Sequence, residues 1–303
     1  MKNLIRKLRV LLNTHSIDGY IIPKNDEFFS EHANKDRLKK ITNFTGSAGY
    51  AIILKNKNYL FVDSRYTIQA KIESGKKFEI CDYEKVFDFK EIKNFTIGLD
   101  PALFTSEQIK KIFPRKNIKV IKENLVDKII KYKKSKINKF YPLDKQITGQ
   151  SHLEKINIII EFLKKNKLDH IFVSAPENVA WLLNIRGKDS PTSPIPNSHL
   201  LISRNRKKIL IAPKEKLKIL IKKKIININE ILEPKEFNKI NKRLSGSRIL
   251  LDIKSCSLKF EELFLKKFKV FKKNDPTYYL KSIKNKVEID NTIKTHIQDG
   301  VAL

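Results

Sequence analysis

Residues 50–63 read YAIIL-KNKN-YLFVD, and this stretch decides the fold. Two runs of β-branched and aromatic residues flank a short polar turn, which is typical of a β-hairpin. Residues 199–212, HLLI-SRNRK-KILIA, repeat the same pattern in the second half of the chain. The sequence therefore predicts two hairpins, one in each of two similar structural units.

The segments that precede the two hairpins also occur in the same order. An amphipathic helix over residues 4–12 comes before the short apolar run IDGYIIP, residues 17–23. A second helix over residues 153–163 comes before LDHIFVS, residues 168–174. Short runs rich in isoleucine, valine and phenylalanine between polar segments predict buried strands.

The segments that follow the hairpins strengthen the repeat. The apolar runs TIGLDP and RILLDI each end in an aspartate, Asp100 and Asp252. In the second half, APENVAWLLNIRG predicts a further helical stretch that ends at Gly187. Helices that alternate with strands in this order predict two tandem α/β domains, each with a mixed sheet covered by helices.

The polar, lysine-rich stretch over residues 131–150 predicts the boundary between the two domains. We expect a first domain at residues 1–140 and a second at 141–283. Residues 284–303 would then start a third domain.

The C-terminal stretch DPTYYLKSIKNKVEIDNTIKTHIQDGVAL carries apolar residues at steps of three or four over much of its length. This spacing predicts one amphipathic helix, and no Gly, Asn or Pro signals its end before Leu303. We expect that its apolar face packs against a part of the protein beyond the two domains. The apolar residues are Leu280, Ile283, Val287, Ile293, Ile297 and Val301.

The chain has 303 residues, a hydrophobic fraction of 41% and a net charge of +30. Only ten of its 63 basic residues are arginine, and the lysines are spread along the whole chain. Proteins that read nucleic-acid phosphates usually gather arginine and aromatic residues on one motif. We therefore favour a biased composition over a basic nucleic-acid binder, which stays as a less favoured reading.

The sequence predicts neither a membrane span nor a signal peptide. It contains no apolar run of 18 residues, and its N-terminus is typical of an amphipathic helix. The two cysteines, Cys81 and Cys256, do not have metal-binding spacing. A reducing, cytoplasmic location is therefore expected.

Two short motifs in the first half allow a functional or a structural interpretation. In FTGSAG, residues 44–49, Gly46 and Gly49 suit a tight turn or an anion-binding backbone, and we favour the turn. In FVDSRYTIQA, residues 61–70, Asp63 suits a helix N-cap. Arg65 then either grips a carboxylate or peptide carbonyl, or forms an internal salt bridge.

One long loop of the second half, NIRGKDSPTSPIPNSH at residues 184–199, contains three prolines. Such loops often bind a ligand or contact another domain, although a pair between Arg186 and Asp189 would be purely structural. The six histidines include no HExxH pair, and no catalytic constellation is visible. The residues alone predict an α/β protein of two domains without a visible activity.

Five ordered segments resemble one known family. IDGYIIPKNDEFFSEH, DRLKKITNFTGSAGYAIIL, FVDSRYTIQA, ENVAWLLNIRGKDSPTSPIPNSHLLI and KSIKNKVEIDNTIKTHIQDGVAL are similar to the N-terminal two-thirds of the long form of the aminopeptidase P family. This family, the Xaa-Pro aminopeptidases, belongs to the creatinase/prolidase superfamily. The resemblance implies two tandem creatinase N-terminal-like α/β domains, followed by the first helix of a "pita-bread" catalytic domain.

The resemblance also implies a reaction and its metals. The family removes the N-terminal residue from peptides with proline in second position. Two manganese ions, held by two Asp, one His and two Glu of the third domain, activate the attacking hydroxide. We expect these ligands to lie beyond the present chain, so that the chain binds no metal, is inactive alone and gates the substrate. The alternatives are a stand-alone protein-binding module or the product of a decaying gene.

Few residue roles follow from the resemblance. Arg65 matches a family arginine that contacts the peptide, and Ser64 replaces the glycine that precedes it. Phe28 and His32 stand where the family often has His and Tyr. A structural or substrate-proximal role is implied for four residues of the long loop, which are Asn184, Arg186, Gly187 and Asp189. The resemblance also implies two partners, the catalytic domain and possible pairing with a second copy of the chain.

Overall fold

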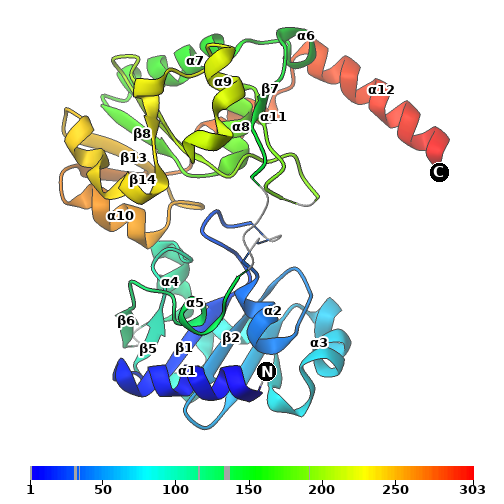
Figure 1. Cartoon of the computed structure of the whole chain (residues 1–303), viewed down its shortest axis with the longest axis vertical. Coiled ribbons are helices and arrows are strands. Elements are labelled where there is room, and N and C mark those ends of the chain that lie inside the picture. The colour runs from blue at the N-terminus through cyan, green and yellow to red at the C-terminus, as the bar shows by residue number, and fades with distance from the viewer. Residues whose placement is uncertain (1, 31–32, 34, 115–116, 133–136, 191) are drawn as a thin grey trace. The chain divides into compact units, whose positions relative to one another are not determined.

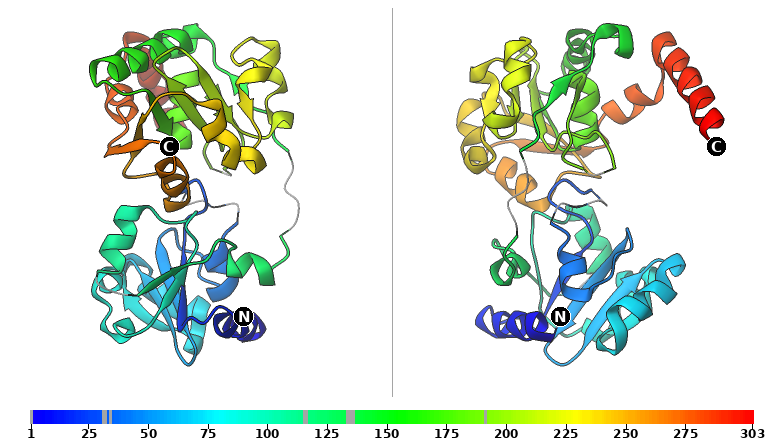
Figure 2. Two further views of the ribbon diagram at one scale, coloured as in Figure 1. Left: turned by 90° about the vertical axis from the view of Figure 1, so that its left-hand side faces the viewer. Right: turned by 45° about the vertical axis from the view of Figure 1, so that its right-hand side comes forward.

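The computed structural model describes residues 2–30, 33, 35–114, 117–132, 137–190 and 192–303. The chain divides into two compact units (Figures 1 and 2). The first unit contains residues 1–135 together with 257–259, and the second contains residues 136–256 and 260–303. Residues 284–303 therefore group with the second unit.

The first unit is built on a six-stranded mixed sheet with the strand order β4-β3-β2-β1-β5-β6. The hairpin predicted at residues 50–63 is confirmed as an antiparallel pair in which Tyr50 lies opposite Phe61. The outer strand pairs are parallel. The strands are β1 (Gly19–Pro23), β2 (Gly49–Leu54), β3 (Asn58–Val62), β4 (Glu79–Asp82), β5 (Ile97–Leu99) and β6 (Ile118–Val120).

Helices cover both faces of this sheet because successive residues of a strand point to opposite faces. On β1, Tyr20 and Ile22 join one apolar core, whereas Ile21 joins the other. The helices of the unit are α1 (Lys2–Thr14), α2 (Arg37–Thr42), α3 (Thr67–Ser74), α4 (Ser106–Ile112) and α5 (Leu125–Ile129). Short 3₁₀ turns lie at η1 (Ser64–Tyr66), η2 (Gly75–Lys77), η3 (Tyr83–Asp88) and η4 (Lys90–Ile92).

The second unit repeats this plan with the strand order β12-β11-β10-β8-β13-β14. Its hairpin is confirmed as well, with His199 opposite Ile211. A two-stranded sheet joins β7 to β9. The strands are β7 (Tyr141–Pro142), β8 (His170–Val173), β9 (Ile185–Arg186), β10 (His199–Ser203), β11 (Lys208–Ile211), β12 (Ile231–Leu232), β13 (Arg248–Asp252) and β14 (Lys269–Lys273).

Two apolar cores again lie on the two faces of the larger sheet. One of them packs under α7 and α8, and the other packs under α10. The helices are α6 (Lys145–Thr148), α7 (His152–Lys165), α8 (Pro176–Leu183), α9 (Lys218–Lys222), α10 (Leu258–Leu265), α11 (Thr277–Ser282) and α12 (Lys286–Ala302). The 3₁₀ segments are η5 (Lys214–Lys216), η6 (Ile228–Glu230) and η7 (Pro234–Arg243).

Two predicted helices differ from the structure. The helix expected to end at Gly187 ends at Leu183, because Asn184 adopts a left-handed backbone with φ 51° and Ile185–Arg186 continue as β9. The single helix expected at the C-terminus is two helices. Asn285 starts the second one by accepting a hydrogen bond from Glu288 N, and the Glu288 side chain accepts one from Asn285 N.

The second of these helices, α12, extends away from the body of the second unit (Figure 2). Its first turns are fixed to α6, because Asn285 donates to Thr148 O and Asn291 donates to Ile147 O. Beyond Asn291 every residue of the helix is exposed.

Candidate functional site

The corner at the end of β3 holds the candidate substrate residue Arg65. Asp63 caps the short turn η1 by accepting a hydrogen bond from Arg65 N at 3.0 Å, which confirms its predicted capping role. The same carboxylate accepts from Arg65 Nε at 2.8 Å and from Nη2 at 3.3 Å. The Arg65 side chain is nevertheless 73% exposed. The internal salt bridge is therefore confirmed, and the contact of Arg65 with a carboxylate or peptide carbonyl stays a prediction.

The neighbours of Arg65 tie this corner to the glycine-rich loop. The Arg65 guanidinium lies 5.6 Å from the ring centroid of Tyr66, and the Tyr66 hydroxyl is 3.0 Å from Ser47 Oγ. In the same loop Thr45 Oγ1 donates to Glu73 at 2.6 Å. Burial acts to raise the pKa of Glu73, but the hydrogen bonds from Thr45 outweigh it and lower that pKa.

The glycines of this loop serve close packing. A Cβ on Gly46 would lie 2.1 Å from the Phe44 ring, and one on Gly49 would lie 2.8 Å from Phe61 O. Neither glycine has a positive φ, and Ser64 has none either. The replacement of a family glycine by Ser64 therefore strains no backbone here. The favoured interpretation of the loop as a tight turn agrees with this packing.

The second candidate region, the loop after α8, begins with a buried amide. Asn184 donates from Nδ2 to Gln150 O at 2.7 Å and to Thr148 Oγ1 at 3.2 Å. Its Oδ1 accepts a hydrogen bond from Lys155 Nζ at 2.8 Å. Asn184 therefore joins α8 to α7 and to the segment before it, which is a structural role.

The remaining loop residues are also held inside the second unit. Arg186 donates to Ile185 O at 2.9 Å and to Ala180 O at 3.4 Å. Asp189 pairs with Lys216 at 2.6 Å and accepts from Asn197 N at 2.8 Å. The pair between Arg186 and Asp189 that the sequence allowed is thus not among the interactions described.

Phe28, Gly187 and His32 are the remaining residues singled out from the sequence, and Phe28 N donates to Asp26 Oδ1 at 2.9 Å. A Cβ on Gly187 would lie 2.8 Å from Pro196 Cα, so the glycine permits a close backbone approach. His32 lies outside the described residues. Arg65 belongs to the first unit and the loop of residues 184–189 belongs to the second.

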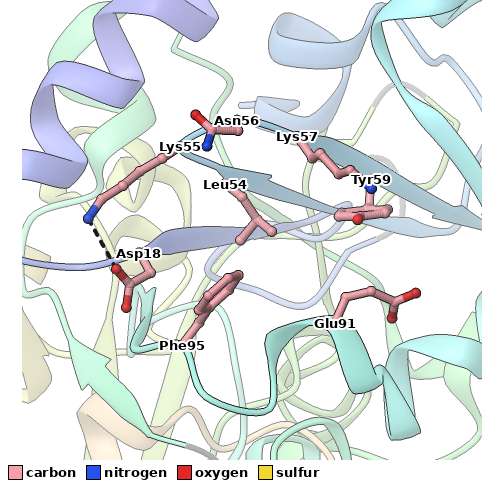
Figure 3. A pocket seen from close by; sticks show the side chains of 8 residues that line it. All are labelled: Asp18, Leu54, Lys55, Asn56, Lys57, Tyr59, Glu91 and Phe95. Atoms are coloured by element: carbon pink, nitrogen blue, oxygen red, sulfur yellow. Dashed lines mark hydrogen bonds and ion pairs between the residues drawn. The ribbon is translucent and has the colours of Figure 1, made fainter.

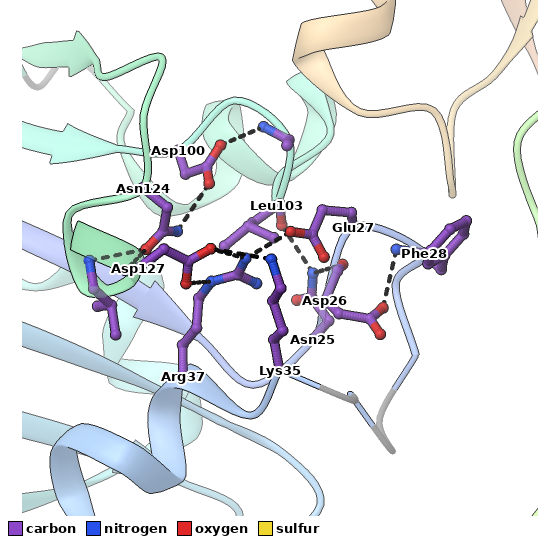
Figure 4. A network of polar contacts seen from close by, with 12 residues as sticks. Asn25, Asp26, Glu27, Phe28, Lys35, Arg37, Asp100, Leu103, Asn124 and Asp127 are labelled. Atoms are coloured by element: carbon purple, nitrogen blue, oxygen red, sulfur yellow. Dashed lines mark hydrogen bonds and ion pairs between the residues drawn. The ribbon is translucent and has the colours of Figure 1, made fainter. Parts of the chain in front are cut away.

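Sequence reasoning missed a buried charge cluster in the first unit, shown in Figure 4. Arg37, at the start of α2, is 1% exposed and donates from Nε and Nη2 to the two oxygens of Asp127 at 2.8 and 2.7 Å. Nη2 also reaches Glu27 at 2.6 Å. Nη1 is buried and has no hydrogen-bond partner among the residues that the structure describes. No local sequence pattern predicts this cluster, because Arg37 and Asp127 are 90 residues apart in the sequence.

The charges of this cluster depend on one another. Burial acts to raise the pKa of Glu27 and of Asp127, but the Arg37 guanidinium outweighs burial and lowers both pKa values. Nearby, Asp100 follows β5 and accepts from Ala102 N and Asn124 Nδ2, each at 2.8 Å. Burial raises the pKa of Asp100. These groups lie at the carboxyl ends of β1 and β5, where open α/β sheets often bind ligands.

A buried lysine was missed in the second unit. Lys155 is 1% exposed, and its Nζ lies 4.0 Å from the centroid of the Trp181 ring. It donates to Asn184 Oδ1 and, at 3.2 Å, to Trp181 O. Burial lowers the pKa of Lys155 to about 8, and the charge of Glu288 at the start of α12 opposes this. The alternation of polar and apolar residues in α7 does not single out this lysine.

Within the ranges that the structure describes, no group of three or more His, Cys, Asp or Glu side chains is arranged to hold a metal ion. In the same ranges, no helix has the length and apolarity needed to cross a membrane.

Comparisons with known proteins assign both units. The family model of the Creatinase/Prolidase N-terminal domain matches residues 5–129, and a second model with the same description matches residues 131–288. The probable Xaa-Pro aminopeptidase P of Laccaria bicolor is 30% identical over 99% of this chain and 50% of its own length. Xaa-Pro aminopeptidase 1 of Dictyostelium discoideum is 28% identical over 99% of this chain and 51% of its own length.

A solved structure shares the fold of the whole chain. The X-prolyl aminopeptidase from Caenorhabditis elegans, described as a cytosolic enzyme with a di-nuclear active site, matches 98% of this chain with a TM-score of 0.85 and 22% identity. The match covers 54% of that chain. The present chain thus spans about half the length of the curated relatives it matches. Two tandem domains, both matched by family models, place the chain in the creatinase/prolidase N-terminal domain family.

Proposed function

We propose that this chain forms the noncatalytic N-terminal part of a cytoplasmic Xaa-Pro aminopeptidase and gates peptide access to a catalytic domain. The supporting observation is the match of 99% of the chain to one half of relatives named Xaa-Pro aminopeptidase P. On this proposal the two manganese ions and their ligands belong to the catalytic domain. The chain alone does not cleave peptides, and pairing with a second copy would be a further property of the whole enzyme.

Arg65 is the residue proposed to contact the peptide. The ion pair with Asp63 fixes the side chain while leaving it open to solvent, and Nη1 makes no hydrogen bond among the described residues. A guanidinium in this state can donate to a peptide carbonyl or carboxylate without first breaking a buried contact. Ile68, three residues after Arg65 on helix α3, also has an exposed side chain.

The helix α12 supports the proposal of a further covering domain. Ile289, Ile293, Ile297 and Val301 recur every four residues and are between 42% and 83% exposed. Such a row is on one face of the helix and needs a partner to be shielded from water. We propose that the catalytic domain covers it. A stand-alone protein-binding module, in which another protein covers the same row, is the second candidate.

The first test is to read the gene beyond the codon for Leu303 and to express the chain with any catalytic domain encoded there. In that enzyme, Arg65→Ala should lower kcat/KM for Xaa-Pro peptides about tenfold, since a charge-assisted hydrogen bond is lost. Its manganese content, measured by mass spectrometry, should not change. Arg6→Ala, an exposed arginine of α1, is the matched control and should behave as wild type.

Three results would contradict the proposal. The first is manganese-dependent release of the N-terminal residue by the chain alone. The second is an unchanged kcat/KM in the Arg65→Ala enzyme. The third is a gene that encodes no catalytic domain after this chain or near it, which would favour the protein-binding module.

A further inference from the structure

A cavity of about 480 Å³ lies within the first unit and has no role in the proposed function (Figure 3). Three segments that are distant in the sequence line it. They are the residue before β1, the turn between β2 and β3, and the segment from η4 to the start of β5. Its volume falls in the range of roughly 300–1,000 Å³ that is usual for small-molecule pockets.

The cavity has an apolar wall. Leu54 and Tyr59 are 6% and 1% exposed, so most of their surface is packed into the sheet. Phe95 differs, because 36% of this large apolar side chain is exposed, and Figure 3 shows its ring facing Leu54. An aromatic ring left open beside a cavity offers contact area to an apolar group of a ligand.

One of the two lysines at the cavity is already paired. Lys55 Nζ lies 3.1 Å from Asp18 Oδ1, and Asp18 Oδ2 accepts a hydrogen bond from Thr96 N at 2.9 Å. This pair ties the β2–β3 turn to the segment before β5 and so forms a fixed side of the cavity. Its charges cancel, and it offers a ligand little net attraction.

The other two charges at the cavity are opposite in sign and are not joined in an ion pair. Among the residues that the structure describes, Lys57 and Glu91 form no ion pair with each other or with another group. Lys57 hydrogen-bonds the Tyr59 side chain, and Glu91 acts on it through its charge alone. Burial raises the pKa of Tyr59, the Lys57 charge opposes this shift, and the Glu91 charge adds to it. An ammonium and a carboxylate that form no ion pair with each other therefore border the same cavity.

We propose that this cavity binds a short apolar peptide with both termini free, in the size class of a dipeptide. The ligand ammonium would pair with Glu91, its carboxylate with Lys57, and its side chains would contact Phe95 and Leu54. Because both anchoring charges are exposed, each contributes little, and a dissociation constant on the order of 1 mM is expected. A single amino acid would leave much of the cavity empty.

The cavity is distinct from the Arg65 corner. Lys57 precedes β3 and Asp63 follows it, so the two sites lie at opposite ends of a five-residue strand. At about 3.3 Å per residue, this separates them by roughly 17 Å. The inference therefore does not rest on the proposed function, and Arg65→Ala should leave dipeptide binding unchanged.

The test is a titration of the ¹⁵N-labelled full chain followed by NMR chemical shifts. Leucyl-leucine should give saturable shifts at the amides of residues 54–59 and 95. N-acetyl-leucyl-leucine lacks the ammonium and leucyl-leucinamide lacks the carboxylate, and each should bind about three- to fivefold more weakly. Glycyl-glycine and free leucine, which lose apolar contact, should bind more weakly than leucyl-leucine.

Variants of Glu91 and Lys57 test which of these side chains binds the ligand ammonium and which binds the ligand carboxylate. Glu91→Gln should abolish the preference for leucyl-leucine over its acetylated form and keep the preference over the amide. Lys57→Gln should do the reverse, and Phe95→Ala should weaken all ligands. Glu84→Gln and Lys71→Gln change exposed charges of the same unit outside the cavity and should have no effect.

The assignment is overturned by equal affinity for the free and blocked dipeptides, by equal affinity for free leucine, or by shifts confined to other parts of the chain. An absence of saturable shifts up to tens of millimolar leucyl-leucine, roughly ten times the expected dissociation constant, would also overturn it. Loss of Arg65 function in the aminopeptidase assay would leave these outcomes unaffected.

Discussion

The two units place an aspartate at the same point of the same topology but surround it differently. Asp100 follows β5, which pairs in parallel with β1. Asp252 ends β13, which pairs in parallel with β8. In the first unit the neighbourhood is ionic, because Arg37 joins Asp127 and Glu27 close by. Figure 4 shows Asp100 beside this cluster.

In the second unit the corresponding aspartate is held by neutral donors. Asp252 accepts from Ser255 Oγ at 2.6 Å, from Tyr278 OH at 3.0 Å and from Asp275 N at 3.0 Å. Asp275 in turn accepts from Asn178 Nδ2 at 2.9 Å, and burial raises its pKa. The shared topology thus fixes where the aspartate lies in the sheet. The side chains that surround its carboxylate differ between the two units.

This difference can be measured separately in each unit. Trp181 is the sole tryptophan of the chain and lies in the second unit, so its fluorescence reports unfolding there. Circular dichroism reports helices and strands of both units. A change confined to circular dichroism therefore belongs to the first unit.

The largest effect is expected from Arg37→Ala. Removal of the guanidinium leaves Asp127 and Glu27 without their buried partner, which should lower the free energy of unfolding of the first unit by about 3–5 kcal/mol. Urea unfolding should show an earlier circular-dichroism transition and an unchanged Trp181 transition. Arg6→Ala is the control. A loss below about 1 kcal/mol would show that the ionic cluster does not hold the first unit together.

The next effect is a difference in acid stability between the units. Burial lowers the pKa of His199 to about 4, and it also lowers the pKa values of His152 and His170. A histidine with a lowered folded pKa resists protonation, so the second unit should lose stability as the pH falls from about 6.5 towards 4. For His199 alone this amounts to about 3 kcal/mol.

The first unit should respond later to acid. The pKa values of Glu27 and Asp127 are lowered, so their contribution is present above the unfolded values near 4.5 and 3.8 and is lost only below them. Urea midpoints measured between pH 7 and 5 should therefore fall for the Trp181 transition first. His199→Gln should reduce that fall, and equal pH profiles of the two transitions would refute this contrast.

A smaller effect is expected from Asp252→Asn. The amide keeps one acceptor oxygen but turns a donor towards Ser255 or Tyr278, which should cost the second unit about 1–3 kcal/mol. The Trp181 transition should shift while the first unit does not. Asp290→Asn, which removes an exposed ion pair with Lys286 on α12, should shift it by less than about 0.5 kcal/mol. Similar shifts for both variants would show that the neutral network adds little.

Several features were predictable because their determinants are neighbours in the sequence. The hairpins follow from runs of apolar residues around short polar turns, and the Asp63 cap with its ion pair to Arg65 spans only two residues. The end of α8 was misplaced because Asn184 takes a left-handed backbone that its side-chain contacts to residues 148–155 support. The break before α12 was missed for a similar reason, since Asn285 is anchored to Thr148.

By itself, the sequence determined the two α/β units, their hairpins and the family to which the chain belongs. Only the tertiary structure decided which distant polar groups meet. Arg37 finds Asp127 across 90 residues, Lys155 lies under Trp181, and the cavity gathers residues from three separate segments. Local patterns encode burial and turns through neighbouring residues, whereas a buried charge is satisfied by partners that only the folded chain brings within hydrogen-bonding distance.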